Sequence, residues 1–282
     1  MDILVTGASG NVGGALFRQQ NLRHHRLFAG TSSGTFADPR VEALLVDLER
    51  GVGPECTFDA IFLMRPPHLT DPDPFRRFLD RYDRSTRIVF LSVQGAEHKG
   101  YLPHAKIEAA IRDMGFVHCF VRPSYFMENL LTTLAEELKK SGRIYLPAGR
   151  LALDWISVDD VAACAAAALI GKADRSAVSA CSGSTMTFTE AIDIVNYEAG
   201  TCFRYESASL PGFIIHERKR GRSWGMIAVA LLLHFLPRFS HEKDCRSHVL
   251  DVLGRKPETL SNWAQQHRFR LRELDHGKHT KE

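Results

Sequence analysis

The sequence predicts an α/β protein in which a doubly wound parallel sheet is followed by a smaller C-terminal lobe. Three observations predict this class. Short apolar runs alternate with amphipathic helical stretches through the first half of the 282 residues. A glycine-rich turn directly follows the first apolar run. From Trp155 onward the alternation is replaced by mostly helical periodicity.

The first half supplies the strands and crossover helices in turn. The candidate strands are Ile3 to Thr6, Leu27 to Gly30, Ala43 to Val46, Ala60 to Met64, Ile88 to Ser92 and Val117 to Val121. Helical periodicity lies between them at Val12 to Gln20, Pro74 to Tyr82 and Lys106 to Met114. Glycine at 115 is placed to end the last of these helices.

The second half predicts a helix at Val158 to Ile170 and then a separate lobe. We expect residues 1–182 to form the sheet domain, with 125–149 contributing to the lobe that residues 183–267 complete. Helices at Thr189 to Glu198 and Met226 to Leu236 flank a candidate strand at Cys202 to Tyr205. Residues 268–282 are charged and lack apolar periodicity, so we expect a flexible tail.

Composition excludes several classes of protein. With 44% hydrophobic and 24% charged residues, the chain can bury a core, and a net charge of +3 gives no footprint for nucleic acid. The six cysteines show no zinc-like spacing, so we expect buried thiols and no metal site. No secretory signal is visible, and the stretch from Met226 to Leu236 is about half of the ~20 residues that a membrane span needs. We therefore expect a cytoplasmic protein that binds neither membrane nor nucleic acid.

The run TGASGNVGG, from Thr6 to Gly14, has the composition of a phosphate-binding loop. A strand, a glycine turn and an amphipathic helix follow one another in that order, which lets a pyrophosphate approach backbone amides at the helix N-terminus. A tight turn with a helix cap is the alternative for a glycine triplet alone, but its place directly after the strand favours a Rossmann dinucleotide site. The spacing TGxxGxxG is that of short-chain dehydrogenase relatives.

The end of the second predicted strand bears on which dinucleotide binds. A carboxylate there would bind the ribose hydroxyls of NAD, whereas this strand ends in Gly30, Thr31 and Ser32. Hydroxyls can hydrogen-bond a 2′-phosphate, so NADP is favoured and NAD stays possible. Arg40 is a further candidate for the phosphate. Asp47, which closes the third strand, is a candidate near the adenine or an ordinary turn residue.

Several longer motifs resemble the NmrA-like family, an atypical branch of the short-chain dehydrogenases. They are GAEHKGYLPHAKIEAAI, VRPSYFMENLL and GRIYLPAGRLALDWISVDDVA, together with the glycine loop and DAIFLMRPP. The resemblance covers roughly residues 1–170 and weakens afterwards. It implies a Rossmann fold and dinucleotide binding. Because the family includes NADPH-dependent quinone and azo reductases as well as redox-sensing regulators, it does not by itself imply catalysis.

The resemblance also implies roles for residues that match the motifs. The pyrophosphate would lie against Gly7, Ser9, Gly10, Asn11, Val12 and Gly13, the adenosine end against Thr31 and Ser32, and the nicotinamide side against Met64, Arg65 and Pro66. Ser92, at the carboxyl end of the fifth strand, lies where open parallel sheets bind ligands, so we expect it to contact the cofactor.

This sequence departs from the resemblance in two places. The stretch between Asp47 and Asp59 is too short for the usual crossover helix, so we expect a loop there. The YxxxK signature of the wider superfamily is absent, because Tyr101 and Lys106 are five residues apart and would not stack on one helix face.

Lys106 is the leading catalytic candidate. It matches a lysine that stands near the nicotinamide in the related ether and isoflavone reductases, although an exposed lysine at a helix start would look the same. His104 and Tyr101 are the other candidates for a proton donor beside a developing oxyanion. Lys106 is also expected to touch the cofactor as a ribose anchor.

A small-molecule substrate is expected beyond the sixth strand. Tyr125, Phe126 and Asn129 follow that strand and could form an aromatic wall, with core packing as the alternative. Trp224, Phe213 and the helix at Met226 to Leu236 could close the pocket from the second lobe. The basic cluster Arg218, Lys219, Arg220 and Arg222 could bind an anion or a protein partner, although such runs usually form solvated loops. A homodimer is possible.

Three functions fit these residues. The first is an NAD(P)H-dependent oxidoreductase acting on a small quinone-like, aromatic or carbonyl substrate. The second is a redox-sensing regulator that binds the dinucleotide without turnover. Nucleoside-sugar epimerase chemistry also fits the glycine loop, but it asks for the missing YxxxK.

Overall fold

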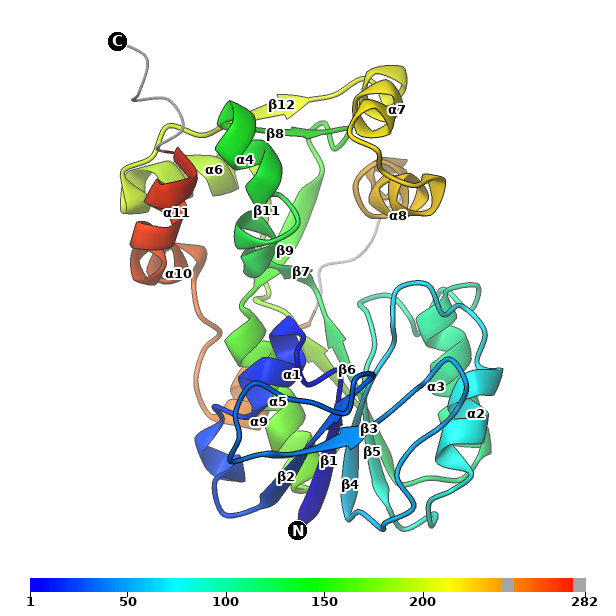
Figure 1. The fold of residues 1–282 in the computed structure, drawn as a ribbon. Helices are drawn as coiled ribbons and strands as arrows, with labels where there is room; N and C mark the ends of the chain where they lie inside the picture. Colours follow the sequence, from blue (N-terminus) through cyan, green and yellow to red (C-terminus); the bar gives the residue numbers. More distant parts are fainter. Residues whose placement is uncertain (240–245, 276–282) are drawn as a thin grey trace. The chain divides into compact units, whose positions relative to one another are not determined.

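A computed structural model describes residues 1–239 and 246–275 (Figure 1). The contacts between residues divide the chain into two compact units. The first unit comprises residues 1–124, 158–181 and 246–257, and the second comprises the described residues of 125–157, 182–239 and 258–275. The chain therefore leaves the first unit three times and returns to it twice. The sequence predicted the passage of residues 125–149 into the lobe and placed all of residues 183–267 there, so it did not include the return of residues 246–257.

The first unit is built on a parallel sheet of seven strands in the order β3-β2-β1-β4-β5-β6-β10. The strands are β1 (Asp2–Thr6), β2 (Arg26–Thr31), β3 (Glu42–Leu45), β4 (Ala60–Met64), β5 (Arg87–Leu91), β6 (His118–Pro123) and β10 (Ala177–Ala180). This is the doubly wound order, with its reversal between β1 and β4. The predicted fold class is confirmed, and the six predicted strands are all present.

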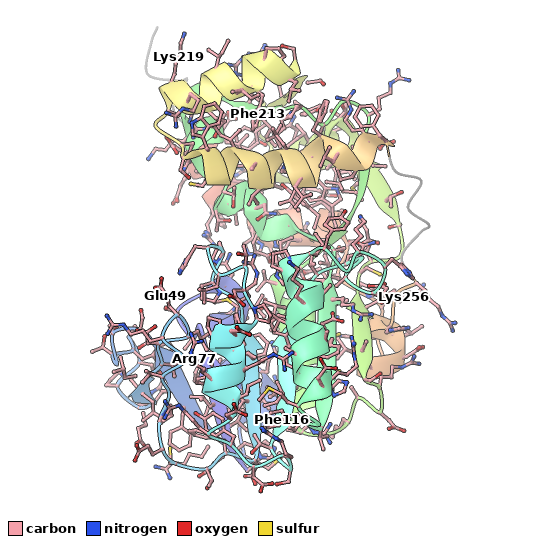
Figure 2. All side chains as sticks on the ribbon, turned by 90° about the vertical axis from the view of Figure 1, so that its right-hand side faces the viewer. Glu49, Arg77, Phe116, Phe213, Lys219 and Lys256 are labelled. Atoms are coloured by element: carbon pink, nitrogen blue, oxygen red, sulfur yellow. The ribbon has the colours of Figure 1, made fainter. Side chains whose placement is uncertain are left out.

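Helices cover both faces of this sheet. On one face lie α1 (Asn11–Leu16) and the alanine-rich α5 (Val158–Leu169), which pack against each other. On the other face α2 (Asp73–Leu79) and α3 (Pro103–Asp113) run side by side (Figure 2). The single-turn η1 (Gln20–Leu22) follows α1, and α9 (Val249–Leu253) packs against α5 and β10.

Strands buried on both faces explain the near-continuous apolar runs of the sequence. Ile3, Leu4 and Val5 of β1 are fully buried, as are Ala60 to Leu63 of β4. No helix forms between β3 and β4, as the short spacing predicted. The loop packs on α2 instead, and the Tyr82 hydroxyl just beyond that helix donates to the carbonyl of Pro54 at 3.3 Å.

The second unit is a mixed lobe with two small sheets. One sheet has the order β11-β9-β7 and the other pairs β12 with β8. Its strands are β7 (Tyr125–Phe126), β8 (Arg143–Leu146), β9 (Ala152–Ile156), β11 (Thr185–Thr187) and β12 (Arg204–Ser207). Its helices are η2 (Met127–Leu131), α4 (Ala135–Ser141), α6 (Phe188–Ala199), α7 (Leu210–Lys219), α8 (Trp224–His234), η3 (Leu236–Phe239), α10 (Leu260–Gln266) and α11 (Arg268–Asp275). Trp155, Phe188, Phe213 and Trp263 form the centre of its core.

The expected tail begins as a helix rather than a flexible segment. Leu271 of α11 is fully buried against the core of the second unit, and the Arg272 guanidinium donates to the Ala199 carbonyl at 2.6 Å. The prediction was wrong for residues 268–275, because two apolar positions among many charges hide the buried face of a short helix. Residues 276–282 lie outside the described part of the chain.

The cysteines differ in part from the expectation of buried thiols. Cys119 and Cys164 are buried, and burial raises the pKa of the Cys119 thiol to about 11 and that of Cys164 to about 12. Cys56 and Cys202 are exposed, Cys181 is disulfide-bonded, and Cys245 lies outside the described residues. None of the helices in residues 1–239 and 246–275 is long and apolar enough to cross a membrane.

Candidate functional site

The glycine loop connects β1 to α1 at the carboxyl edge of the sheet. Gly7 has a φ of +61°, in the left-handed region that favours glycine, and its carbonyl accepts the N–H of Gly10 at 2.9 Å. Gly10 caps α1 without a side-chain hydrogen bond, so no side chain of the loop occupies the cap. The first-turn amides of a helix placed this way are donors available for a phosphate.

Gly13 is the glycine that the packing of the loop requires most. A Cβ on Gly13 would lie 2.2 Å from the carbonyl oxygen of Gly7, which is closer than real Cβ contacts allow. A Cβ on the neighbouring Gly14 would lie 3.5 Å from the Ala8 carbonyl oxygen, an ordinary contact. The third glycine of TGxxGxxG therefore lets the helix lie directly on the turn, the role that glycine has in dinucleotide loops.

The loop after β4 lies next to the glycine loop. The Thr6 hydroxyl accepts the N–H of Met64 at 2.9 Å, and the Met64 methyl group fills the space where a Cβ of Gly7 would be. Met64 thus lies at the reversal of strand order, where doubly wound sheets bind ligands. The structure brings the pyrophosphate and nicotinamide candidates of the sequence together at one edge.

Hydroxyl groups, and no carboxylate, directly follow β2. Thr31 is buried and its hydroxyl donates to the Thr35 carbonyl at 3.0 Å, while Ser32 is exposed. Arg40 does not stand free: its exposed guanidinium pairs with the partly exposed carboxylate of Asp38 at 2.8 Å, and this pair lowers the pKa of Asp38 to about 2. An exposed pair of this kind is weak and can rearrange when a phosphate offers a better partner.

Asp47 shapes a turn. Its carboxylate accepts the N–H of Arg50 at 3.1 Å, and its backbone pairs with Val52 in an isolated bridge. This geometry matches the turn alternative that the sequence left open, and contact with adenine stays a prediction.

Arg65 is bound to its own loop. One terminal nitrogen, Nη1, donates to the carbonyls of Pro66 at 3.0 Å, Pro67 at 2.8 Å and Leu69 at 2.7 Å. Its Nε donates to Nε2 of His104 at 3.2 Å. Burial and the Arg65 charge lower the pKa of His104 to about 4, so this imidazole is neutral near pH 7 and accepts at Nε2. The pair joins the loop after β4 to the start of α3.

A buried ion pair follows one turn later on α3. Glu108 is fully buried and its carboxylate accepts from Arg122 of β6 at 2.9 Å and 2.6 Å. The Ser92 hydroxyl donates to the same carboxylate at 2.5 Å. Ser92 is therefore placed at the carboxyl edge, as predicted, with its proton directed toward Glu108. Sequence reasoning missed Glu108 and Arg122, and only their charge within apolar runs could have indicated them.

Two catalytic candidates lie on the surface of the first unit. Tyr101 is 66% exposed and precedes α3, while Lys106 is exposed on its first turn. Neither is desolvated, in contrast to His104, whose accepting nitrogen is taken by Arg65. The catalytic roles of all three residues stay predictions. The residues described contain no cluster of three or more His, Cys, Asp or Glu side chains that could hold a metal ion.

The substrate candidates Tyr125, Phe126 and Asn129 belong to the second unit. The Tyr125 hydroxyl is 3.2 Å from Nε2 of His234, whose Nδ1 donates to the Ala230 carbonyl at 2.9 Å. Burial lowers the pKa of His234 to about 4 and raises that of Tyr125. Tyr125 also packs edge to face on Trp155, so this member of the aromatic wall belongs to the core, whereas Phe126 and Asn129 are partly exposed and their contact with substrate stays a prediction.

The remaining candidates of the second lobe have different surroundings. Trp224 is 63% exposed and lies under the Arg218 guanidinium at 4.9 Å, whereas Phe213 is fully buried and cannot close a pocket. The basic cluster is not a solvated loop throughout, because Arg220 and Arg222 both pair with Glu136 at 2.7 Å.

Comparisons with known proteins agree with this architecture. Residues 92–215 match the model of the NmrA-like family. The chain is 25% identical to "Prestalk A differentiation protein A" of Dictyostelium discoideum, covering 94% of this chain and 92% of that protein. It is 27% identical to "Uncharacterized oxidoreductase YesF" of Bacillus subtilis, covering 94% of each.

A solved structure shows the same fold over nearly the full length. The triphenylmethane reductase of Citrobacter sp., solved in complex with NADP(H), superposes with a TM-score of 0.77 at 17% identity and covers 95% of this chain and 100% of that one. The matched residues include the buried pair on α3 and β6 and the three motifs between Gly95 and Ala162, whereas the glycine loop and DAIFLMRPP precede the matched range. The resemblance of this chain to the NmrA-like family is therefore confirmed.

Proposed function

We propose that this protein is an NADP(H)-dependent reductase that transfers a hydride to a flat, conjugated acceptor such as a quinone, an aromatic dye or a small carbonyl compound. The observation that carries the proposal is the glycine loop. A Cβ on its third glycine, Gly13, would lie 2.2 Å from the Gly7 carbonyl oxygen, and the loop lies at the reversal of strand order. Doubly wound sheets bind dinucleotides at that point.

The residues after β2 fit NADP better than NAD. A carboxylate directly after this strand would repel a 2′-phosphate, and here Thr31, Ser32 and Ser33 stand in that place. The exposed guanidinium of Arg40 lies in the same loop, where it pairs with the partly exposed carboxylate of Asp38. The Citrobacter reductase with bound NADP(H) and the oxidoreductase YesF support the same cofactor class and reaction class.

The acceptor class follows from the surroundings of the proton donors. A bound dihydronicotinamide supplies a hydride, and the acceptor takes one proton in addition. His104 is neutral and its Nε2 accepts from Arg65, which makes it a poor acid. Acceptors whose reduced form is a stabilised anion can take that proton from water or from exposed Lys106. Quinones and conjugated dyes have this property.

Steady-state oxidation of NADPH, followed as absorbance loss with a panel of quinones, dyes and aldehydes, tests the proposal. We expect turnover with quinones or dyes and a higher kcat/KM with NADPH than with NADH. Tight NADPH binding without turnover on any acceptor would refute the reductase. Lys106→Ala is expected to lower kcat by about tenfold or more while leaving NADPH affinity within about twofold, since proton donors contribute at least that much.

One observation favours a second function, a regulator that binds the dinucleotide without turnover. Tyr101 and Lys106 are exposed to solvent, and Nε2 of His104 accepts from Arg65, so none of these three side chains has the buried, unoccupied setting of a proton donor in an active site. The relative named as a differentiation protein is consistent with such a role. The same assay separates the two, because a regulator binds NADPH and oxidises none.

A further inference from the structure

An apolar groove of about 550 Å³ opens along α8 in the second unit. Its size is within the range of small-molecule sites. Every side chain that lines it is a hydrocarbon, and none can form a hydrogen bond or carry a charge: Leu210, Ala228, Val229, Leu231, Leu232, Phe235 and Leu236. Such a surface favours an apolar ring or chain and disfavours polar groups, which would lose their hydration without compensation.

The groove is preformed because α8 is fixed from its opposite side. His234 is buried and bonds both to Ala230 on its own helix and to Tyr125 of the core. Ile227, which is 3% exposed, anchors the first half of the helix. The outer face, in contrast, leaves Val229 50% and Leu236 54% exposed. Contiguous exposed apolar surface of this kind marks a binding site more often than an ordinary surface.

Positive charge stands at the rim. The Arg238 guanidinium lies 5.5 Å from the centre of the Phe235 ring, and Phe235 lines the groove. Arg238 donates to the Pro147 carbonyl at 3.2 Å, and no ion pair with a carboxylate is found for it within residues 1–239 and 246–275. The charge complement of this rim is an anion.

We propose that this groove binds an amphiphilic anion, with an apolar ring system or chain along α8 and a carboxylate or sulfonate on Arg238. The site uses residues of the second unit only, so it does not depend on the dinucleotide proposal. Its two parts make separate demands on the ligand. The hydrocarbon lining sets the affinity for the body of the ligand, and Arg238 sets the preference for the charged group.

A matched pair of fluorescent probes separates these contributions in the full chain. 8-Anilinonaphthalene-1-sulfonate carries the charge, and N-phenyl-1-naphthylamine is the same ring system without it. Val229→Gln changes the lining and is compared with Leu250→Gln, a leucine of the first unit with a similar exposure of 52%. Arg238→Gln is compared with Arg268→Gln, since Arg268 also stacks on an aromatic ring, Phe269, at 4.8 Å.

We expect the wild type to bind both probes, and the two control variants to bind like it. Val229→Gln should weaken both probes by about tenfold, and Leu236→Gln serves as a second lining variant, exposed enough to leave the fold intact. Arg238→Gln should weaken the sulfonate by about fivefold to tenfold and the neutral probe by less than about twofold, the effect of one charge-assisted contact. Circular dichroism verifies that each variant is folded.

Four results would overturn the proposal. Arg238→Gln could weaken both probes equally, which removes the anion preference, or Val229→Gln could bind like Leu250→Gln. Sedimentation equilibrium could show that the wild type and Leu250→Gln are dimers and Val229→Gln is a monomer. That result would mean that the groove binds a second copy of the chain. Co-sedimentation with phosphatidylserine vesicles that only the groove variants lose would assign it to a lipid surface.

Discussion

Gly13 and Gly14 are neighbours in one helix, yet the structure gives them opposite roles. A Cβ added to Gly13 would lie 2.2 Å from the Gly7 carbonyl oxygen, which leaves no space for a side chain. A Cβ added to Gly14 would lie 3.5 Å from the Ala8 carbonyl oxygen, an ordinary contact distance. The spacing TGxxGxxG already singles out Gly13 as the third glycine of the loop, but the sequence alone does not show why Gly13 needs glycine more than Gly14 does. The distinction depends on how closely α1 approaches the end of β1.

Gly13→Ala is expected to destabilise the protein by about 1–3 kcal/mol, the usual cost of forcing an atom into a packed site. Gly14→Ala should be neutral or stabilising by up to about 1 kcal/mol, because alanine favours a helix over glycine. Urea unfolding of both variants at one pH measures the difference. Equal stabilities for the two variants would show that the turn and helix are not in close contact.

His234 predicts a pH dependence of stability. Its pKa is lowered from 6.5 to about 4 in the folded chain, so the unfolded chain takes up a proton first as pH falls. The stabilisation from keeping this ring neutral is complete above about pH 6.5 and is lost as pH falls toward 4, about 3 kcal/mol in all.

His234→Gln keeps an acceptor for the Tyr125 hydroxyl but does not titrate. Between pH 7 and pH 5 its free energy of unfolding should fall by about 2 kcal/mol less than that of the wild type. Exposed His24 provides the control, since His24→Gln should follow the wild type. Denaturant titrations at both pH values give the comparison, and parallel curves for wild type and His234→Gln would contradict the assignment.

At the scale of the element, α3 is attached to the sheet by two polar contacts one turn apart. His104 accepts a hydrogen bond from Arg65 in the loop after β4, and Glu108 forms an ion pair with Arg122 of β6. The apolar periodicity of α3 could be read from the sequence, which predicted a helix at Lys106 to Met114, but the helix begins three residues earlier, at Pro103, and ends at Asp113. The polar partners of α3 could not be predicted from the sequence, because the pairing depends on how β4 and β6 lie beside the helix.

Glu108→Gln is expected to cost about 3 kcal/mol, because it leaves the Arg122 charge without its buried partner. Glu97 provides a matched control: its carboxylate pairs with the same guanidinium at 3.4 Å, but its side chain is 34% exposed. Glu97→Gln should cost less than about 1 kcal/mol, as partly solvated pairs do. Urea midpoints that do not differ between the variants would refute a stabilising role for the buried pair.

At the scale of the whole molecule, the sequence predicted the parallel sheet from its long apolar runs. It did not predict β10, because Ala177 to Ala180 is short and its residues are mostly small. It also missed the return of residues 246–257 to the first unit. That return depends on contacts such as the Arg255 side chain on buried Asp160 at 2.6 Å, which no local pattern reveals.

The candidate site was predicted unevenly for the same reason. The glycine loop and Met64 come together because they end neighbouring strands, and strand ends are visible in the sequence. Lys106, Tyr101 and His104 are adjacent in sequence but have different surroundings in the structure, and only His104 is desolvated. Burial and hydrogen-bond partners distinguish these three residues, and both are properties of the folded chain that the sequence does not show.

The central claim is that the glycine loop binds NADP(H), and an equilibrium titration of the full chain with NADPH and NADH tests it most directly. We predict saturable NADPH binding at a single site, with a lower Kd than that of NADH. Gly13→Ala should raise the Kd for NADPH by at least about tenfold, whereas Gly14→Ala should bind NADPH like the wild type. Absence of binding in the wild type, or equal binding by the wild type and Gly13→Ala, would contradict the account.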